Sequence, residues 1–271
     1  MKELQNLHTH TNYCDGIDSP ENIIKVALEK GFTSIGFSGH SYMHYSPEHS
    51  MSLEGTEQYK KEILTLKEKY KGQFDVFLGL EFDMYSEIDM TGYEYMIGSL
   101  HYLKKGNEYI PFDRGADEVQ RVIDNHFGGD GMAFSKEYFR QFAELPKYGN
   151  FDIIGHIDIH TKNIEKTIFF DVESKEYINS VITCLDAFKG KIHFFEVNTG
   201  AISRGYRTTP YPTANILKEL KRMGFGAIIS SDCHDARYLD MAFDDARELL
   251  LSCGFDEQYI LTNNGFKAIE L

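Results

Sequence analysis

The 271-residue sequence predicts an α/β fold, built as a single closed barrel of parallel strands with helices around it. Two observations lead to this prediction. Seven short runs rich in apolar residues recur along the chain, and a polar segment with an amphipathic stripe follows each of them. No Pro-, Gly- or Ser-rich linker separates these units, although the length would also suit two ordinary domains. The sequence therefore predicts one domain, residues 1–271.

The seven predicted strands are apolar almost throughout, which is typical of strands buried on both faces of a parallel sheet. The segments SIGF, VFLGL, DIIG and FGAIIS show this pattern. In chain order, the predicted strands are residues 4–8, 33–38, 75–81, 96–101, 151–156, 191–198 and 226–232.

Capping signals mark the helices between these strands. Ser19 and Pro20 predict the start of the first helix, and Gly31 predicts its end. Thr213 and Gly224 bracket a later helix in the same way. The predicted buried stripe of the first helix consists of Ile23, Ile24, Ala27 and Leu28.

Two irregular stretches follow strands, residues 41–55 after the second and 199–213 after the sixth. In parallel barrels, the loops after the strands build the active site. Both stretches are therefore predicted to be substrate loops.

The composition excludes several classes of protein. The chain has 28 Lys and Arg against 42 Asp and Glu, a net charge of −14, which argues against a general nucleic-acid binder. No apolar run resembles a signal peptide or a membrane span, so we expect a soluble, cytoplasmic protein with no membrane partner. The four cysteines are scattered without a disulfide-framework spacing. A protein with this net negative charge can still bind a small anionic substrate if cationic groups lie in its binding site.

Six of the seven predicted strands end in a residue type that binds metal ions. Residues i and i+2 of a strand point to the same side, so His8 and His10 converge, as do Asp232 and His234. The candidate ligands are His8, His10, Asp15, His40, Glu81, His101, His156, Asp232 and His234. This set exceeds what one ion needs and predicts two or three divalent ions of Zn, Mn or Fe, without an organic cofactor.

On these motifs the chain resembles the PHP (polymerase and histidinol phosphatase) family of metal-dependent phosphoesterases. The matching segments are NLHTH, FSGH, the pair GSLH and IGH, and SDCH. Within the family, the loop at residues 196–212 and the segment GHID at 155–158 resemble the histidinol-phosphate phosphatases. The resemblance implies a distorted (β/α)₇ barrel with a metal cluster at the carboxyl ends of the strands.

The resemblance also implies how the ligands are shared among three ions, with Glu81 as a bridge. The implied sets are His8, His10, Glu81 and Asp232 for the first ion, Asp15, His40 and His234 for the second, and Glu81, His101 and His156 for the third. Asp232, Glu81 and His234 are the expected catalytic residues.

The implied reaction is the hydrolysis of L-histidinol phosphate to L-histidinol and phosphate, a step of histidine biosynthesis. A hydroxide that bridges two ions is the expected nucleophile. Arg204 and Arg207 are expected to bind the phosphate because guanidinium groups hold phosphate oxygens bidentately. Lys162 is a third candidate, and it stands where related phosphatases often carry Arg.

Two alternatives stay open at this point. One is a nuclease or nucleotide phosphoesterase of the same family, and the other is a metal-binding module without catalysis. The sequence leaves the oligomeric state undetermined. His44 and His49 are loop residues that either contact substrate or are simply exposed, whereas His126, His160 and His193 are assigned to the surface or the core.

Overall fold

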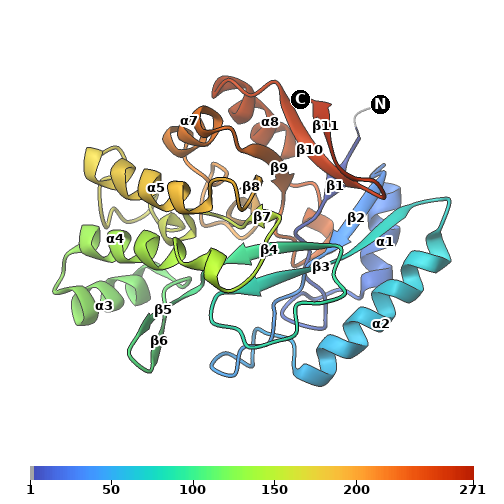
Figure 1. Ribbon diagram of the computed structural model, residues 1–271, viewed down its shortest axis with the longest axis horizontal. Coiled ribbons are helices and arrows are strands. Elements are labelled where there is room, and N and C mark those ends of the chain that lie inside the picture. Colours follow the sequence, from blue (N-terminus) through green and yellow to red (C-terminus); the bar gives the residue numbers. More distant parts are fainter. Residues whose placement is uncertain (1–2) are drawn as a thin grey trace.

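A computed structural model describes residues 3–271, and its centre is a seven-stranded parallel sheet surrounded by helices (Figure 1). Neighbouring strands in the sheet follow their order in the chain. The strands are β1 (Gln5–Asn6), β2 (Ser34–Phe37), β3 (Asp75–Asp83), β4 (Tyr95–Ser99), β7 (Ile153–Ile154), β8 (Phe194–Asn198) and β9 (Gly226–Ser230). Each predicted run overlaps one of them, and only β3 and β4 extend beyond the predicted bounds, so the predicted order of strands is confirmed.

The last strand returns to the first and closes the barrel. Just beyond β1 and β9, Thr9 and Cys233 form a parallel bridge. The amide of His10 donates to the carbonyl of Cys233 at 2.8 Å, and the amide of Cys233 donates to the carbonyl of His8 at 3.0 Å. The closure thus lies at the carboxyl ends of the strands, within the segments that carry the predicted ligands.

Helices cover the outside of this sheet. They are α1 (Pro20–Glu29), α2 (Leu53–Tyr70), α3 (Ala116–Phe127), α4 (Gly131–Phe142), α5 (Lys175–Phe188), α7 (Ala214–Met223) and α8 (Phe243–Ser252). The short α6 (Gly200–Ser203) lies instead in the loop after β8, beside Asp232. Ser19 caps α1 as predicted, since its side chain accepts a hydrogen bond from the amide of Asn22. Leu28 was wrongly placed in the buried stripe: it is 43% exposed, at the edge of the face that Ile24 and Ala27 bury. No helix within residues 3–271 is long and apolar enough to span a lipid bilayer.

Two hairpins were not predicted. One consists of β5 (Tyr102–Lys105) and β6 (Glu108–Pro111), and the other of β10 (Glu257–Thr262) and β11 (Gly265–Glu270). The side chain of Gln5 on β1 exchanges hydrogen bonds of 2.7 and 2.8 Å with the backbone of Leu261, which attaches the second hairpin to the barrel. Each hairpin pairs residues that are close in sequence, such as Lys105 with Glu108 and Thr262 with Gly265. The predicted strands are apolar runs that precede helices, and these partly exposed antiparallel strands do not fit that pattern.

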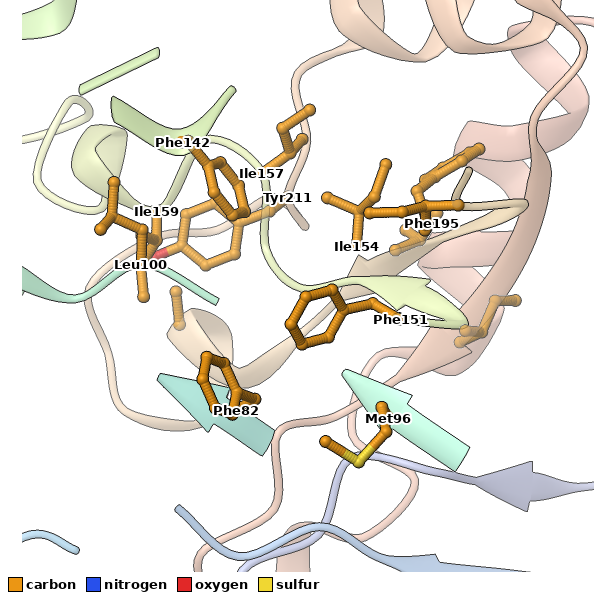
Figure 2. Close-up of a cluster of buried hydrophobic side chains, with 14 of the residues drawn as sticks. Phe82, Met96, Leu100, Phe142, Phe151, Ile154, Ile157, Ile159, Phe195 and Tyr211 are labelled. Carbon is orange, nitrogen blue, oxygen red and sulfur yellow. The ribbon is translucent and has the colours of Figure 1, made fainter. Parts of the chain in front are cut away.

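The barrel separates two apolar clusters because successive side chains of a strand point to opposite faces. Phe77 and Tyr95 belong to a small inner cluster. The larger cluster lies between strands and helices, and Figure 2 shows part of it, with Phe82, Met96, Ile154, Phe195 and Phe142 gathered from four strands and α4. This packing on both faces holds the strand ends in fixed positions.

His160 belongs to the core rather than to the metal cluster. It is 3% exposed, its ring stacks on Tyr138 at a centroid distance of 4.1 Å, and its Nε2 lies 3.0 Å from the hydroxyl of Ser135. Burial lowers the pKa of His160 well below its ordinary value. The folded protein therefore keeps this imidazole neutral.

We expect His160 to make the folded state less stable in acid. Below about pH 6.5 the unfolded chain binds a proton at this histidine that the folded chain does not, so stability falls as pH falls. In His160→Phe this contribution is absent. The unfolding free energy of each protein is measured by denaturant unfolding at pH 6 and at pH 5. Between these two pH values, the wild type should lose up to about 1.4 kcal/mol more than the variant. A difference independent of pH would contradict the prediction.

Candidate metal centre

The strand ends bring together all nine side chains that the sequence nominated as ligands. They fall into four overlapping groups whose ligand atoms lie within 4.8 Å of one another. The groups are His10, Asp15, His40 and His234; His8, Glu81 and His156; His8, His10 and Asp232; and His40, Asp83 and His101. Only Asp83 in these groups was not predicted.

Glu81 lies at the centre of the cluster and is fully buried. Its Oε2 is 3.2 Å from Nε2 of His8 and 3.0 Å from Nδ1 of His40. Its Oε1 is 3.1 Å from Nε2 of His156 and 3.7 Å from Nε2 of His101. One carboxylate thus faces histidines from four different strand ends, which is the position that a bridging ligand requires.

The first and last strand ends meet on the other side of Glu81. Nε2 of His10 lies 3.2 Å from Oδ1 of Asp232, and Nε2 of His234 lies 3.3 Å from Oδ1 of Asp15. Asp15 reaches the cluster through a tight turn: a Cβ on Gly16 would lie 2.6 Å from the carbonyl carbon of His10, so only glycine fits there. Asp232 itself has a left-handed backbone with φ of 46°, a conformation that clusters at functional sites.

The donor set fits divalent metal ions. Five buried atoms of the cluster side chains have no hydrogen-bond partner among residues 3–271, namely Nε2 of His8, Nε2 of His10, Oδ1 of Asp15, Oε2 of Glu81 and Nδ1 of His156. Two ligand atoms that share an ion at about 2.1 Å with tetrahedral geometry lie about 3.4 Å apart. The separations of 3.2 to 3.5 Å between Oε2 of Glu81 and the His8 and His10 nitrogens match this value.

The cluster is also electrostatically arranged for cations. Burial alone would lower the pKa of His8, but the carboxylates of Glu196, Glu81 and Asp232 outweigh this effect and raise it to about 10. Burial alone would raise the pKa of Glu81, yet His8 and His40 hold it well below its ordinary value. A divalent ion binds the same histidine nitrogens that these protons occupy, so metal binding should release protons from the histidines.

Comparison with known proteins agrees with this geometry. The model of the PHP domain family matches residues 6–200.

The chain belongs to the PHP domain family.

PHP relatives match nearly the whole chain. A histidinol-phosphatase of Bacillus subtilis is 27% identical over 262 residues, covering 88% of this chain and 96% of the relative. A solved structure described as a histidinol phosphatase of Listeria monocytogenes superposes with a TM-score of 0.77 at 18% identity, covering 89% of this chain and 99% of that one. A histidinol phosphate phosphatase of Lactococcus lactis, complexed with Zn, L-histidinol and phosphate, gives a TM-score of 0.68 at 20% identity, covering 97% and 98% of the two chains. The predicted PHP-type (β/α)₇ barrel is therefore confirmed.

Two carboxylates of this PHP barrel form hydrogen bonds with the ring nitrogens of predicted ligand histidines. Neither of them was identified from the sequence. Oε2 of Glu196 accepts a hydrogen bond of 2.8 Å from Nδ1 of His8. Oδ2 of Asp83 lies 3.0 Å from Nδ1 of His40. Strand periodicity carried a signal for Asp83, because it follows Glu81 by two residues and so points to the same side. Glu196 lies in the one strand that showed no ligand at its end.

A cavity of 310 Å³ opens over the cluster. The two predicted substrate loops both line it, the first through Met43, Ser46 and His49, and the second through Arg204 and Tyr206. The first loop is slightly shorter than predicted, since α2 already begins at Leu53.

The histidines outside the cluster differ in whether they line the cavity. His49 lines the cavity, with its Nδ1 3.8 Å from Oδ2 of Asp15, whereas His44 is exposed and does not line it. His193 is exposed and His126 half-buried, as expected for residues outside the cluster.

The three cationic residues expected at the phosphate have different surroundings. Arg204 lines the cavity, with its Nη2 2.9 Å from Oδ2 of Asp232. Lys162 also lines it, paired with Asp113. Arg207 does not line it: its guanidinium is buried, and Nη1 donates to the hydroxyl of Thr161 at 3.0 Å. The structure thus brings two of the three to the cluster.

Arg114 is a further cation that sequence reasoning missed. It lines the same cavity, and its Nη2 donates to the hydroxyl of Tyr102 at 3.2 Å. Among residues 3–271 it forms no ion pair, unlike Arg204 and Lys162. No local pattern marked it, because it lies between the unpredicted hairpin and α3.

Proposed function

We propose that this chain is a metal-dependent phosphomonoesterase that hydrolyses L-histidinol phosphate to L-histidinol and phosphate. The observation that carries the proposal is the convergence of nine His, Asp and Glu side chains beneath one cavity lined by cationic residues. The substrate is inferred from the relatives, one of which is named histidinol-phosphatase and another of which was solved with histidinol and phosphate. A cavity of 310 Å³ suits a small molecule better than a nucleic-acid duplex.

We further propose that residues 1–271 act as one domain with three ion sites. The proposed ligands are His8, His10, Glu81 and Asp232 for the first, Asp15, His40 and His234 for the second, and Glu81, His101 and His156 for the third. The observed groups support this division, since each proposed site shares at least two members with one of them.

Bound divalent ions would activate water and neutralise charge on the phosphate oxygens. The chain's own residues supply orientation. Glu196 accepts a hydrogen bond from Nδ1–H of His8, which leaves Nε2 of that histidine free to face the cluster. Glu81 and Asp232 stay ionised in the buried site because histidines and Arg204 surround them.

The same residues explain how an acidic protein accepts an anionic substrate. Arg204 lines the cavity beside Asp232 and presents N–H donors near the position expected for phosphate. Lys162 and Arg114 add positive charge to the same wall. Asp113 balances Lys162, which leaves Arg114 as the unpaired cation among the described cavity residues.

The test is turnover of L-histidinol phosphate compared with a panel of phosphomonoesters, nucleotides and oligonucleotides, with metal content measured on the same sample. We expect histidinol phosphate to have the highest kcat/KM. Preference for a nucleotide or oligonucleotide would replace this proposal with the nuclease alternative. Full metal loading without turnover of any of them would indicate a metal-binding module.

Removal of metal is expected to destabilise the protein as well as inactivate it. Ligands that bind only the folded state stabilise it by about 2.7 kcal/mol when their free concentration is 100 times Kd. For a chain of this size, that corresponds to a fall in Tm of about 5–10 °C on chelation. Differential scanning calorimetry before chelation, after it, and after Zn²⁺ or Mn²⁺ is restored checks the prediction. An unchanged Tm would show that the cluster holds no ion in the folded protein.

A further inference from the structure

Asp83 contacts two predicted ligand histidines at once. It is the last residue of β3 and is 1% exposed. Its Oδ2 accepts a hydrogen bond from Nδ1 of His40 at 3.0 Å, and its Oδ1 accepts one from Nδ1 of His101. The amide of Asp83 donates to the hydroxyl of Ser41 at 2.9 Å, which fixes the backbone of the carboxylate. Both oxygens of one buried group are therefore used by histidines.

These two histidines come from different strand ends and point into different parts of the cluster. Nε2 of His40 lies 3.7 Å from Oδ2 of Asp15, in the proposed second ion site. Nε2 of His101 lies 3.1 Å from Nε2 of His156, in the proposed third site. Asp83 thus joins, through Nδ1 on each ring, two sites that share no ligand in the proposed division.

Glu196, another carboxylate that accepts from a ligand histidine, contacts only one ligand ring. One of its oxygens accepts from Nδ1 of His8, but the other accepts from the backbone amide of His156 and the side chain of Asn198. Glu196 therefore orients a single ligand ring. Glu81 also faces several rings, but Asp83 differs in that each of its two oxygens accepts a hydrogen bond from Nδ1 of a ligand ring, His40 for one and His101 for the other.

We propose that Asp83 is a positioning residue that couples the second and third ion sites, so that the two ions bind cooperatively. The inference rests on the proposed metal cluster. Because each ring donates its Nδ1 proton to Asp83, Nε2 of each is left with the lone pair that ligates an ion. An ion that holds one ring in place also holds the carboxylate shared by the two rings, so the other ring is already oriented and filling one site prepares the second.

Asp83→Asn provides the sharpest test. The amide of asparagine offers one acceptor oxygen and one donor nitrogen, so it cannot accept from both rings. A ring that faces the amide nitrogen must accept at Nδ1, which places its proton on Nε2 and removes that ligand. Changes of this kind behind a ligand usually weaken metal binding by about 10- to 100-fold. We expect this loss for two ions together, with the site of His8, His10 and Asp232 retained.

The measurements are calorimetric titration of the apoprotein with Zn²⁺ and metal content after gel filtration, for wild type, Asp83→Asn and a matched control, Asp152→Asn. Asp152 is a carboxylate directly before β7, with Oδ2 2.8 Å from the amide of Met96 and no contact to the cluster. The control should bind like wild type. Equal Zn²⁺ binding by Asp83→Asn and wild type, or the loss of only one ion, would overturn the coupling.

Two readouts on the wild type keep the test independent of how well the variant folds. The titration should show no species with only one of the two coupled sites filled. Proton NMR should show downfield Nδ1–H resonances from His40 and His101, and at least one of them should be missing in Asp83→Asn. Stepwise independent filling would overturn the coupling while leaving the proposed function intact. A wild type that binds no Zn²⁺ would overturn the proposed function, and the coupling with it.

Discussion

Replacing Glu81 with glutamine is expected to remove more than one equivalent of bound metal and nearly all phosphatase activity. The two oxygens of Glu81 face different histidines, His8 and His40 on one side and His156 and His101 on the other. Glutamine has no negative charge and keeps only one acceptor oxygen. Loss of ions that supply several kcal/mol of transition-state stabilisation corresponds to a fall in kcat of roughly 10³-fold or more.

Metal content by mass spectrometry and kcat with L-histidinol phosphate check this expectation. Glu57→Gln is a suitable control, because Glu57 is an exposed residue of α2, and that variant should match wild type in both measurements. Circular dichroism should show that Glu81→Gln keeps the fold. If Glu81→Gln retains the wild-type number of ions, Glu81 does not bridge.

Arg204→Ala is expected to reduce kcat/KM by roughly 10²-fold, equivalent to about 2.7 kcal/mol of transition-state stabilisation. Arg204 lines the cavity over the cluster, where a phosphate oxygen gains charge during the reaction. Arg204→Lys should recover only part of the loss, because an ammonium group cannot reproduce the bidentate guanidinium contact.

Arg204 also contacts a proposed metal ligand. Nη2 of Arg204 lies 2.9 Å from Oδ2 of Asp232, a proposed ligand, and Nη1 donates to the carbonyl of the same residue at 3.1 Å. The alanine variant is therefore expected to bind metal more weakly as well, and the kinetics must be measured at saturating metal. The effect on substrate is then separate from the effect on the cluster.

Arg207→Ala is the matched control from the same loop. Arg207 is 6% exposed and does not line the cavity, and its guanidinium donates to Thr161 and Thr209, so its loss should lower stability with little effect on kcat/KM of the folded protein. Should Arg207→Ala prove more damaging to kcat/KM than Arg204→Ala, the phosphate must bind elsewhere than the loop after β8 suggests.

The sequence alone determined the barrel strands and the set of candidate ligands. Buried parallel strands appear as short apolar runs, and side chains of the same strand alternate with a period of two. His8 and His10 therefore had to share a direction, as did Asp232 and His234. Because the carboxyl ends of parallel strands lie at one end of a barrel, ligands at six strand ends had to converge. These features depend on local pattern and on one general rule of topology.

Tertiary structure alone decided which groups form hydrogen bonds with the candidate ligands and which cationic side chains line the cavity. Asp83 meets His40 and His101, and Arg204 meets Asp232, across separations in the chain that no periodicity encodes. Arg207 lies three residues after Arg204, yet its guanidinium turns to Thr161 instead of the cavity. The direction of a long side chain depends on which partner the packed fold places within hydrogen-bond distance, and that partner is distant in sequence.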